Sequence, residues 1–106
     1  MMQFFRRTPD EAFQNIESFD YKTHFISNLV SLSSEYKDFR IAYIDENIQA
    51  KNGTLLFIHG HPTWTYLWRH LISIALKQDY RVLAIDLTGF GKSDNPLKET
   101  FLLLKL

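Results

Sequence analysis

The chain has 106 residues, of which 45% are hydrophobic, and its twelve basic residues balance its twelve acidic ones. This length supports one domain at most, and the apolar content is typical of a folded chain. Without a basic excess, the composition argues against a nucleic-acid partner, and the lack of cysteine excludes disulfides, thiolate catalysis and cysteine-bound zinc. No apolar run approaches the length of a membrane span or a signal peptide, so we expect a cytoplasmic protein without a membrane partner.

The first half of the chain predicts a short leader helix and an antiparallel pair of strands. Thr8 and Glu11 have the spacing of a capping box around Pro9, so we expect a helix over residues 8–17. Apolar and polar side chains alternate, weakly in residues 24–30 and clearly in 39–45, and this alternation is typical of strands. The polar connection between them predicts a hairpin-like arrangement.

The pattern changes at residue 54, where a strand, a helix and a second strand are predicted. Residues 55–58 are continuously apolar, as in a strand that is covered on both faces, and residues 82–85 form a second such run. Between them, residues 66–77 have helical spacing, and Thr63 or Thr65 can cap the helix. The apolar positions at this spacing are Leu67, Trp68, Leu71, Ile72 and Ala75. We expect parallel strands joined by a right-handed crossover.

Each of these two strands ends abruptly in polar residues and glycine. Ligand sites of open α/β sheets lie at the carboxyl ends of the strands. After the first strand, Gly60 permits a sharp turn and Pro62 fixes the exit of the chain. The backbone N–H of His61 can then point into a cleft and stabilise a developing negative charge. The alternative is a tight connection with no chemical role.

Metal binding is the second interpretation of this loop. His59 and His61, with Asp86 after the neighbouring strand, have the composition of a two-histidine, one-carboxylate site. Pro62 ends the extended backbone at once, however, and no further ligand follows at the spacing of a metalloprotein. We therefore expect His59 to have a structural role, and we predict no metal and no cofactor.

The second loop invites a phosphate-binding interpretation, which fails. Gly91-Lys92-Ser93 ends like a Walker A loop, but Asp86 occupies the position of its first glycine. The dinucleotide fingerprint fails as well, since Asp94 replaces its third glycine. We expect Lys92 to be a solvated turn residue and Asp86 to accept hydrogen bonds from its own turn.

Aromatic residues gather at the start of the predicted helix. Most of them are expected to pack in the core, but Trp64 lies nearest to the first loop. It is therefore the candidate for lining a small apolar substrate pocket.

Three successive elements together resemble the α/β-hydrolase fold. They are a strand ending in His-Gly-x-Pro-Thr-Trp, a helix, and a strand ending in Asp-x-x-Gly-Phe-Gly-x-Ser-Asp. More narrowly they resemble the haloalkane dehalogenases, with epoxide hydrolases as close relatives. The leader from Arg7 to Phe19 is similar to that of one dehalogenase branch, so the resemblance covers about residues 7–96. It implies a truncated α/β-hydrolase domain over residues 1–106: an antiparallel strand pair, then a parallel βαβ unit over 54–86. The implied strand order is first, second, fourth, third, fifth.

The resemblance implies a hydrolase in which an aspartate attacks a halogen-bearing carbon, expels halide and forms an ester that a histidine-activated water cleaves. The family usually has Asn or Glu where His61 stands, so the role that carries over to His61 is that of its backbone oxyanion donor. Positions that shape the site in the family are matched by His59, Gly60, Pro62, Asp86, Gly89 and Gly91. The nucleophile, acid and base of the family lie beyond the residues present, so we expect this chain to be inactive alone.

The implied strand order leaves a gap beside residues 55–58, because no segment remains to supply the fifth strand. An apolar strand with an open edge is a template for association, so we expect self-association through this edge. The substrate of a complete site would be a small halogenated molecule or an epoxide. Two alternatives remain open: a fragment of an epoxide hydrolase-like enzyme, and a non-catalytic module that pairs with another chain through the exposed edge.

Overall fold

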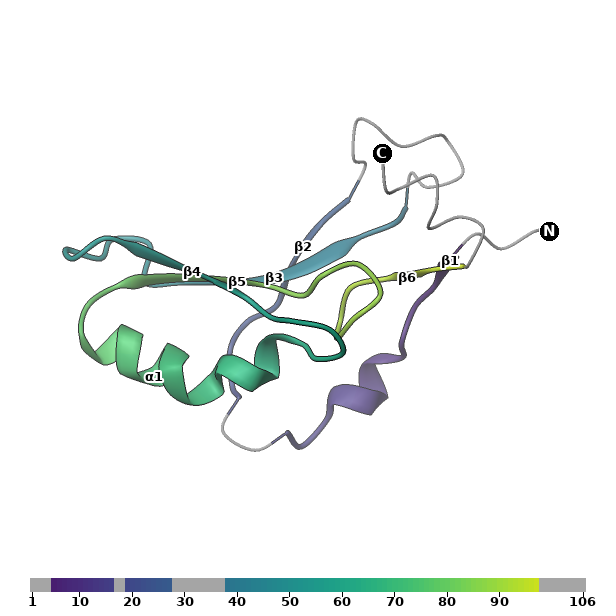
Figure 1. Cartoon of the computed structure of the whole chain (residues 1–106), viewed down its shortest axis with the longest axis horizontal. Coiled ribbons are helices and arrows are strands. Elements are labelled where there is room, and N and C mark those ends of the chain that lie inside the picture. Colours follow the sequence, from purple (N-terminus) through teal and green to yellow (C-terminus); the bar gives the residue numbers. More distant parts are fainter. Residues whose placement is uncertain (1–4, 17–18, 28–37, 98–106) are drawn as a thin grey trace.

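The structure, a computed structural model, describes residues 5–16, 19–27 and 38–97 (Figure 1). These residues form a mixed four-stranded sheet with a helix on one face and a small two-stranded sheet beyond one end. The strands are β1 (Phe5–Arg6), β2 (His24–Ile26), β3 (Ile41–Glu46), β4 (Thr54–Ile58), β5 (Arg81–Ile85) and β6 (Asn95–Pro96). The helices are α1 (Arg69–Lys77) and two single 3₁₀ turns, Asp10–Phe13 and Thr65–Trp68.

The four-stranded sheet has the order β2-β3-β5-β4. β2 and β3 are antiparallel, as are β3 and β5, whereas β4 and β5 are parallel with Ile58 opposite Ile85. This confirms the predicted antiparallel pair followed by a parallel βαβ unit, and the order of the first four strands. The predicted connection between β2 and β3 lies mostly outside the described residues.

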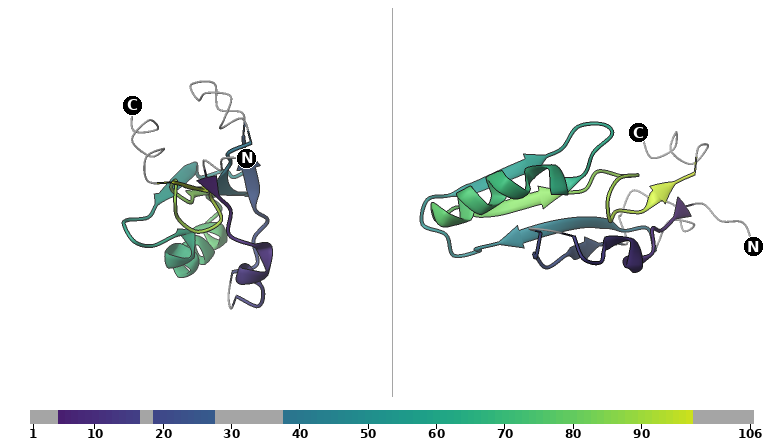
Figure 2. Two further views of the ribbon diagram at one scale, coloured as in Figure 1. Left: turned by 90° about the vertical axis from the view of Figure 1, so that its right-hand side faces the viewer. Right: turned by 90° about the horizontal axis from the view of Figure 1, so that it is seen from below.

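The core lies between one face of the sheet and α1 (Figures 1 and 2). Strand alternation turns Ile44, Val82 and Ala84 toward the helix, where they are buried with Ile72 and Ala75. The alternate residues of β3 and β5 point to the opposite face and are half-buried. Only one face of this sheet is therefore covered by the described part of the chain.

The outer face of α1 differs from the prediction. Trp68, Ile72 and Ala75 face the sheet, but Leu67 and Leu71 have 51% and 48% of their surface exposed. Both leucines belong to the apolar positions of the predicted helix, but they are half exposed because the helix contacts one layer only. Within the described ranges, no helix is long and apolar enough to cross a membrane.

β4 is the edge strand, as predicted, and it is not covered on both faces. Leu55, Leu56 and Ile58 are exposed by 38%, 55% and 52%, since a neighbouring strand lies on one side only. The apolar run itself is typical of a strand covered on both faces, but the partial exposure agrees with the expected open edge, since no fifth strand lies beside β4 among the described residues.

The leader is also shorter than expected. In place of a helix over residues 8–17, the chain makes one 3₁₀ turn, Asp10–Phe13, without a side-chain cap. Pro9 is extended and occupies the capping position, so the proposed capping role of Thr8 is wrong. Asn15 then takes a left-handed conformation (φ 59°), which ends the turn.

Candidate functional site

The carboxyl ends of β4 and β5 bring the two sequence loops together. Because these strands are parallel and in register, residues 59–61 lie beside Asp86 and Leu87. His59 is 3% exposed, and its Nε2 accepts a hydrogen bond from the backbone N–H of Leu87 at 2.8 Å. This bond leaves Nδ1 as the protonated nitrogen, which donates to the Gly60 carbonyl at 2.8 Å. His59 therefore links the two loops.

With both ring nitrogens engaged, His59 has no lone pair available for a metal. In the parts of the chain that the structure describes, no group of three or more His, Asp or Glu side chains could hold a metal ion. The arrangement at this edge is one of hydrogen bonds between loops.

Asp86 holds both its own loop and the start of the preceding helical segment, the Thr65–Trp68 turn that leads into α1. Its buried carboxylate accepts from the Lys92 N–H through Oδ2 and from the Thr65 N–H through Oδ1, each at 2.8 Å. The first bond confirms the predicted turn interaction. The second shows that Asp86 satisfies the first N–H of the Thr65–Trp68 turn, so neither predicted threonine caps the helix. Sequence reasoning missed this contact, because the two residues are 21 positions apart.

Gly91 is required by this geometry. Its φ is +53°, and a Cβ at this position would overlap the Asp86 carboxylate, with Cγ only 2.5 Å away. Gly89 also has a positive φ of +89°. The glycines let the loop fold back over the carboxylate without a side chain between them.

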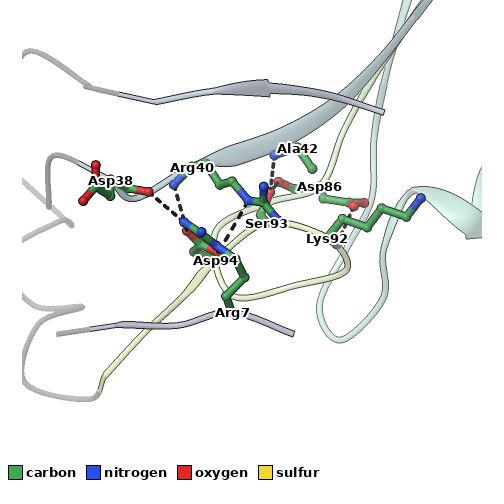
Figure 3. A network of polar contacts seen from close by, with 8 residues as sticks. All are labelled: Arg7, Asp38, Arg40, Ala42, Asp86, Lys92, Ser93 and Asp94. Carbon is green, nitrogen blue, oxygen red and sulfur yellow. Dashed lines mark hydrogen bonds and ion pairs between the residues drawn. The ribbon is translucent and has the colours of Figure 1, made fainter. Parts of the chain in front are cut away.

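The loop ends in an ion pair between buried Asp94 and partly exposed Arg7 of the leader (Figure 3). Asp94 is fully buried, and Arg7 donates to its two oxygens through Nε and Nη2, both at 2.8 Å. The Arg40 N–H adds a third bond at 3.0 Å, and Nη2 of Arg7 also reaches the Asp38 carbonyl. The hydrogen bonds to Asp94 raise the pKa of the Arg7 guanidinium above its usual value. This pair fixes the leader across the end of the sheet.

The Ser93 side chain bridges β3 and the end of β5 just beyond their last strand pair, Tyr43 with Ile85. Its Oγ accepts from the Ala42 N–H at 2.8 Å and donates to the Asp86 carbonyl at 2.5 Å (Figure 3). In the sequence, Arg7, Ser93 and Asp94 stand out only as parts of the leader and loop motifs. Their pairing joins segments 87 and 51 positions apart, and no local spacing predicts it.

His61 lies at the tip of the first loop. Its side chain is exposed, its bond to Pro62 is cis, and its ring meets Phe90 edge-on with centroids 5.1 Å apart. Among the described residues, none accepts a hydrogen bond from the His61 N–H. The backbone donor of the first loop therefore has no partner in the described part of the chain, whereas the residue two positions before it, His59, is hydrogen-bonded.

Trp64 and Lys92 both lie against the leader. The Trp64 ring contacts Phe13 and Phe19, with centroids 5.4 and 5.5 Å apart. Lys92 donates through Nζ to the Thr23 hydroxyl at 2.9 Å and is half-buried, so the expectation of a solvated side chain is wrong. This contact joins residues 69 positions apart, so no local spacing predicts it.

Comparison with known proteins agrees with this geometry. Residues 53–103 match the family model for the alpha/beta hydrolase fold. The chain has the α/β-hydrolase fold and is haloalkane dehalogenase-like. It is 39% identical over 94 residues to a haloalkane dehalogenase of Psychrobacter cryohalolentis and 39% identical over 92 residues to one of Mycobacterium marinum. These alignments cover 89% and 87% of this α/β-hydrolase chain.

The chain spans about 30% of the length of the curated relatives that it matches. A solved structure with a similar fold is the tetrameric haloalkane dehalogenase DpaA from Paraglaciecola agarilytica. It superimposes with a TM-score of 0.79 at 38% identity, covering 91% of this chain and 31% of that one. A Xanthomonas campestris protein named cis-3-alkyl-4-alkyloxetan-2-one decarboxylase is 41% identical over 56 residues, which cover 53% of this chain and 18% of that protein. Similarity in this region therefore accompanies more than one named activity.

Proposed function

We propose that this chain is the amino-terminal part of a haloalkane dehalogenase-like hydrolase, in which it supplies the oxyanion loop and one wall of the active site. The observation that carries the proposal is the free N–H of His61 at the carboxyl end of β4, beside a loop that the chain itself holds in place. The similarity to haloalkane dehalogenases over most of the chain supports the reaction class.

The chemistry needs a donor that is fixed before charge develops. A backbone N–H held in place costs no reorganisation when an oxygen or halide becomes negative, so it stabilises the transition state more than the ground state. The hydrogen bond from Leu87 to His59 restrains the residue two positions before His61. Trp64, which follows the same loop, is proposed to line the pocket for a small halogenated substrate.

In this proposal the nucleophilic aspartate, the acid and the base histidine come from the part of the family fold that these 106 residues do not include. The 106-residue chain is therefore expected to release no halide from short haloalkanes. A cytoplasmic location stays a prediction from the sequence.

A chimera tests the oxyanion role directly. Residues 53–96 of this chain would replace the matching segment of the Psychrobacter cryohalolentis dehalogenase, and halide release from a short bromoalkane would be measured. The His61→Pro variant removes the backbone donor and is expected to lower kcat by about 10²–10³. His61→Ala keeps the N–H and serves as the matched control, with kcat close to that of the parent chimera. Equal activity of a folded His61→Pro chimera would contradict the proposed role.

The exposed edge favours a second candidate, a module that associates through β4. Leu55, Leu56 and Ile58 are exposed, and Thr54–Ile58 carries no charged residue to discourage pairing. Sedimentation of the chain over a dilution series measures this association. Leu56→Lys is expected to shift the chain toward monomer, whereas Ile74→Lys, on the outer face of α1, tests whether exposed apolar surface alone is responsible. A monomer at all concentrations excludes this candidate.

A further inference from the structure

A small cavity lies between the leader, β2 and the second loop, and His61 is not among the residues that line it. Its volume is about 220 Å³, below the 300–1,000 Å³ that is usual for drug-sized ligands, so it suits a small molecule. The lining residues that matter here are Asp10, Phe13, Thr23, Phe25, Arg40 and Lys92. Two of them are cations, and two are aromatic.

Arg40 is a poorly neutralised cation in this cavity. Its guanidinium carbon lies 3.8 Å from the centre of the Phe25 ring, and its Nε is buried without a hydrogen-bond partner. The nearest carboxylate, that of Asp94, is 4.0 Å from Nε and is already held by two bonds from Arg7. A planar guanidinium stacked in this way keeps its outer donors available for a carboxylate.

Lys92 is the second cation. Its Nζ donates to the Thr23 hydroxyl and lies 5.5 Å from the centre of the Phe13 ring. An ammonium has three donors, so two remain after the bond to Thr23. None of the ion pairs in the described part of the chain involves Lys92.

The two cations are spaced along one side of β2. Lys92 contacts Thr23 and Arg40 contacts Phe25, two residues further along the chain. Two residues of extended chain span about 6–7 Å. A single carboxylate therefore meets one cation well, whereas two carboxylates on a short linker can meet both. The one acidic group among the described lining residues is Asp10, which is exposed to solvent.

We propose that this cavity binds a small dicarboxylate, with one carboxylate on Arg40, the other on Lys92, and the linker against Phe13 and Phe25. The aromatic rings supply apolar contact for the methylene groups and keep water from the cations. The proposal is independent of the reaction that the complete site performs.

Glutarate is the probe, and titration calorimetry of the 106-residue chain is the measurement. We expect saturable one-to-one binding that is about tenfold tighter than that of butyrate, the effect of one additional charge-assisted hydrogen bond. Glutaramide, which has the same shape without charge, should bind more weakly than either acid. No saturable binding of glutarate, or equal affinities for glutarate and glutaramide, would overturn the proposal.

Variants assign the binding to this cavity. Lys92→Gln removes the ammonium but keeps the backbone N–H that holds Asp86, so the fold is expected to persist and glutarate should bind no better than butyrate. Arg40→Gln should have a similar effect, and Lys77→Gln, at the exposed end of α1, should have none. An unchanged affinity for glutarate in a folded Lys92→Gln chain would contradict the assignment of the binding to this cavity.

Discussion

Two regions of this molecule differ in how well their side chains are matched to their surroundings. At the carboxyl ends of β4 and β5, the buried side chains of His59, Asp86, Ser93 and Asp94 have partners within the chain, and only the buried Thr65 hydroxyl lacks one among the described residues there. Along the edge of β4 and the outer face of α1, large apolar side chains remain exposed. The loops of the candidate site are thus fixed by local and leader contacts, whereas the apolar flank has no cover among the described residues. The polar groups of the loops are therefore better satisfied than the apolar core around them.

Substitutions on α1 give the largest expected effect on the free energy of unfolding, because one face of the helix packs in the core and the other is exposed. Ile72 is fully buried, so Ile72→Ala should lower the free energy of unfolding by about 2–5 kcal/mol. Ile74→Ala, on the same helix with 55% of its surface exposed, should change it by no more than about 0.5 kcal/mol. Urea unfolding measures both, and equal losses would mean that the outer face is also covered.

The loop region is tested next by Gly91→Ala. The new Cβ would overlap the Asp86 carboxylate at a positive φ, and we expect a loss of about 2–3 kcal/mol in the free energy of unfolding. Gly60→Ala is the matched control in the first loop, because nothing lies within 4 Å of its added Cβ. A loss at Gly91 no larger than at Gly60 would show that the loop relaxes easily.

The contact between leader and loop predicts an intermediate effect for Asp94→Asn. The amide keeps the shape but leaves Arg7 without its charged acceptor, and we expect a loss of about 1–3 kcal/mol, limited by the partial exposure of Arg7. Cleavage by trypsin at Arg7 should become faster as the leader detaches. Asp20→Asn, at an exposed position, should leave both the stability and the cleavage rate unchanged.

The smallest expected effect is a pH dependence at the sheet face away from α1. Arg81 donates two hydrogen bonds to Asp45, at 2.8 and 2.7 Å, and this lowers the pKa of the Asp45 carboxyl from its ordinary value of 3.8. A carboxylate whose pKa is lower in the folded state stabilises the fold above pH 4 and loses that contribution as the pH falls through the folded pKa. The pair is partly exposed, so the effect is small. Unfolding of the parent and Asp45→Asn chains should differ more at pH 7 than at pH 3, and a constant difference would contradict the assignment.

The sequence predicted the strands and loops well because their signals are local. Alternation and apolar runs identified the strands β2 to β5, and the abrupt polar ends of β4 and β5 identified the two loops. The partners within the site escaped prediction, because they depend on contacts between distant segments. Arg7 with Asp94, Asp86 with Thr65, and Ser93 with Ala42 are examples.

The apolar pattern indicates more burial of β4 and of the outer face of α1 than the structure has, and the reason is physical. The apolar content of residues 55–58 and of Leu67 and Leu71 is suited to a sheet and a helix covered on both sides. The sequence pattern of a segment indicates the kind of surface that the segment can pack against. The described residues supply only part of that contact, so the same side chains are exposed here.

The shared carboxylate of Asp86 has a consequence for how this edge opens. One side chain holds an amide of the glycine loop and the first amide of the segment that leads into α1. If either segment moves away, one oxygen of the buried Asp86 carboxylate loses its hydrogen bond. A buried carboxylate with an unpaired oxygen is unfavourable, so the other segment is then released more easily as well. The two segments therefore open as one cooperative unit, and the amide protons of Thr65 and Lys92 should exchange with solvent at similar rates.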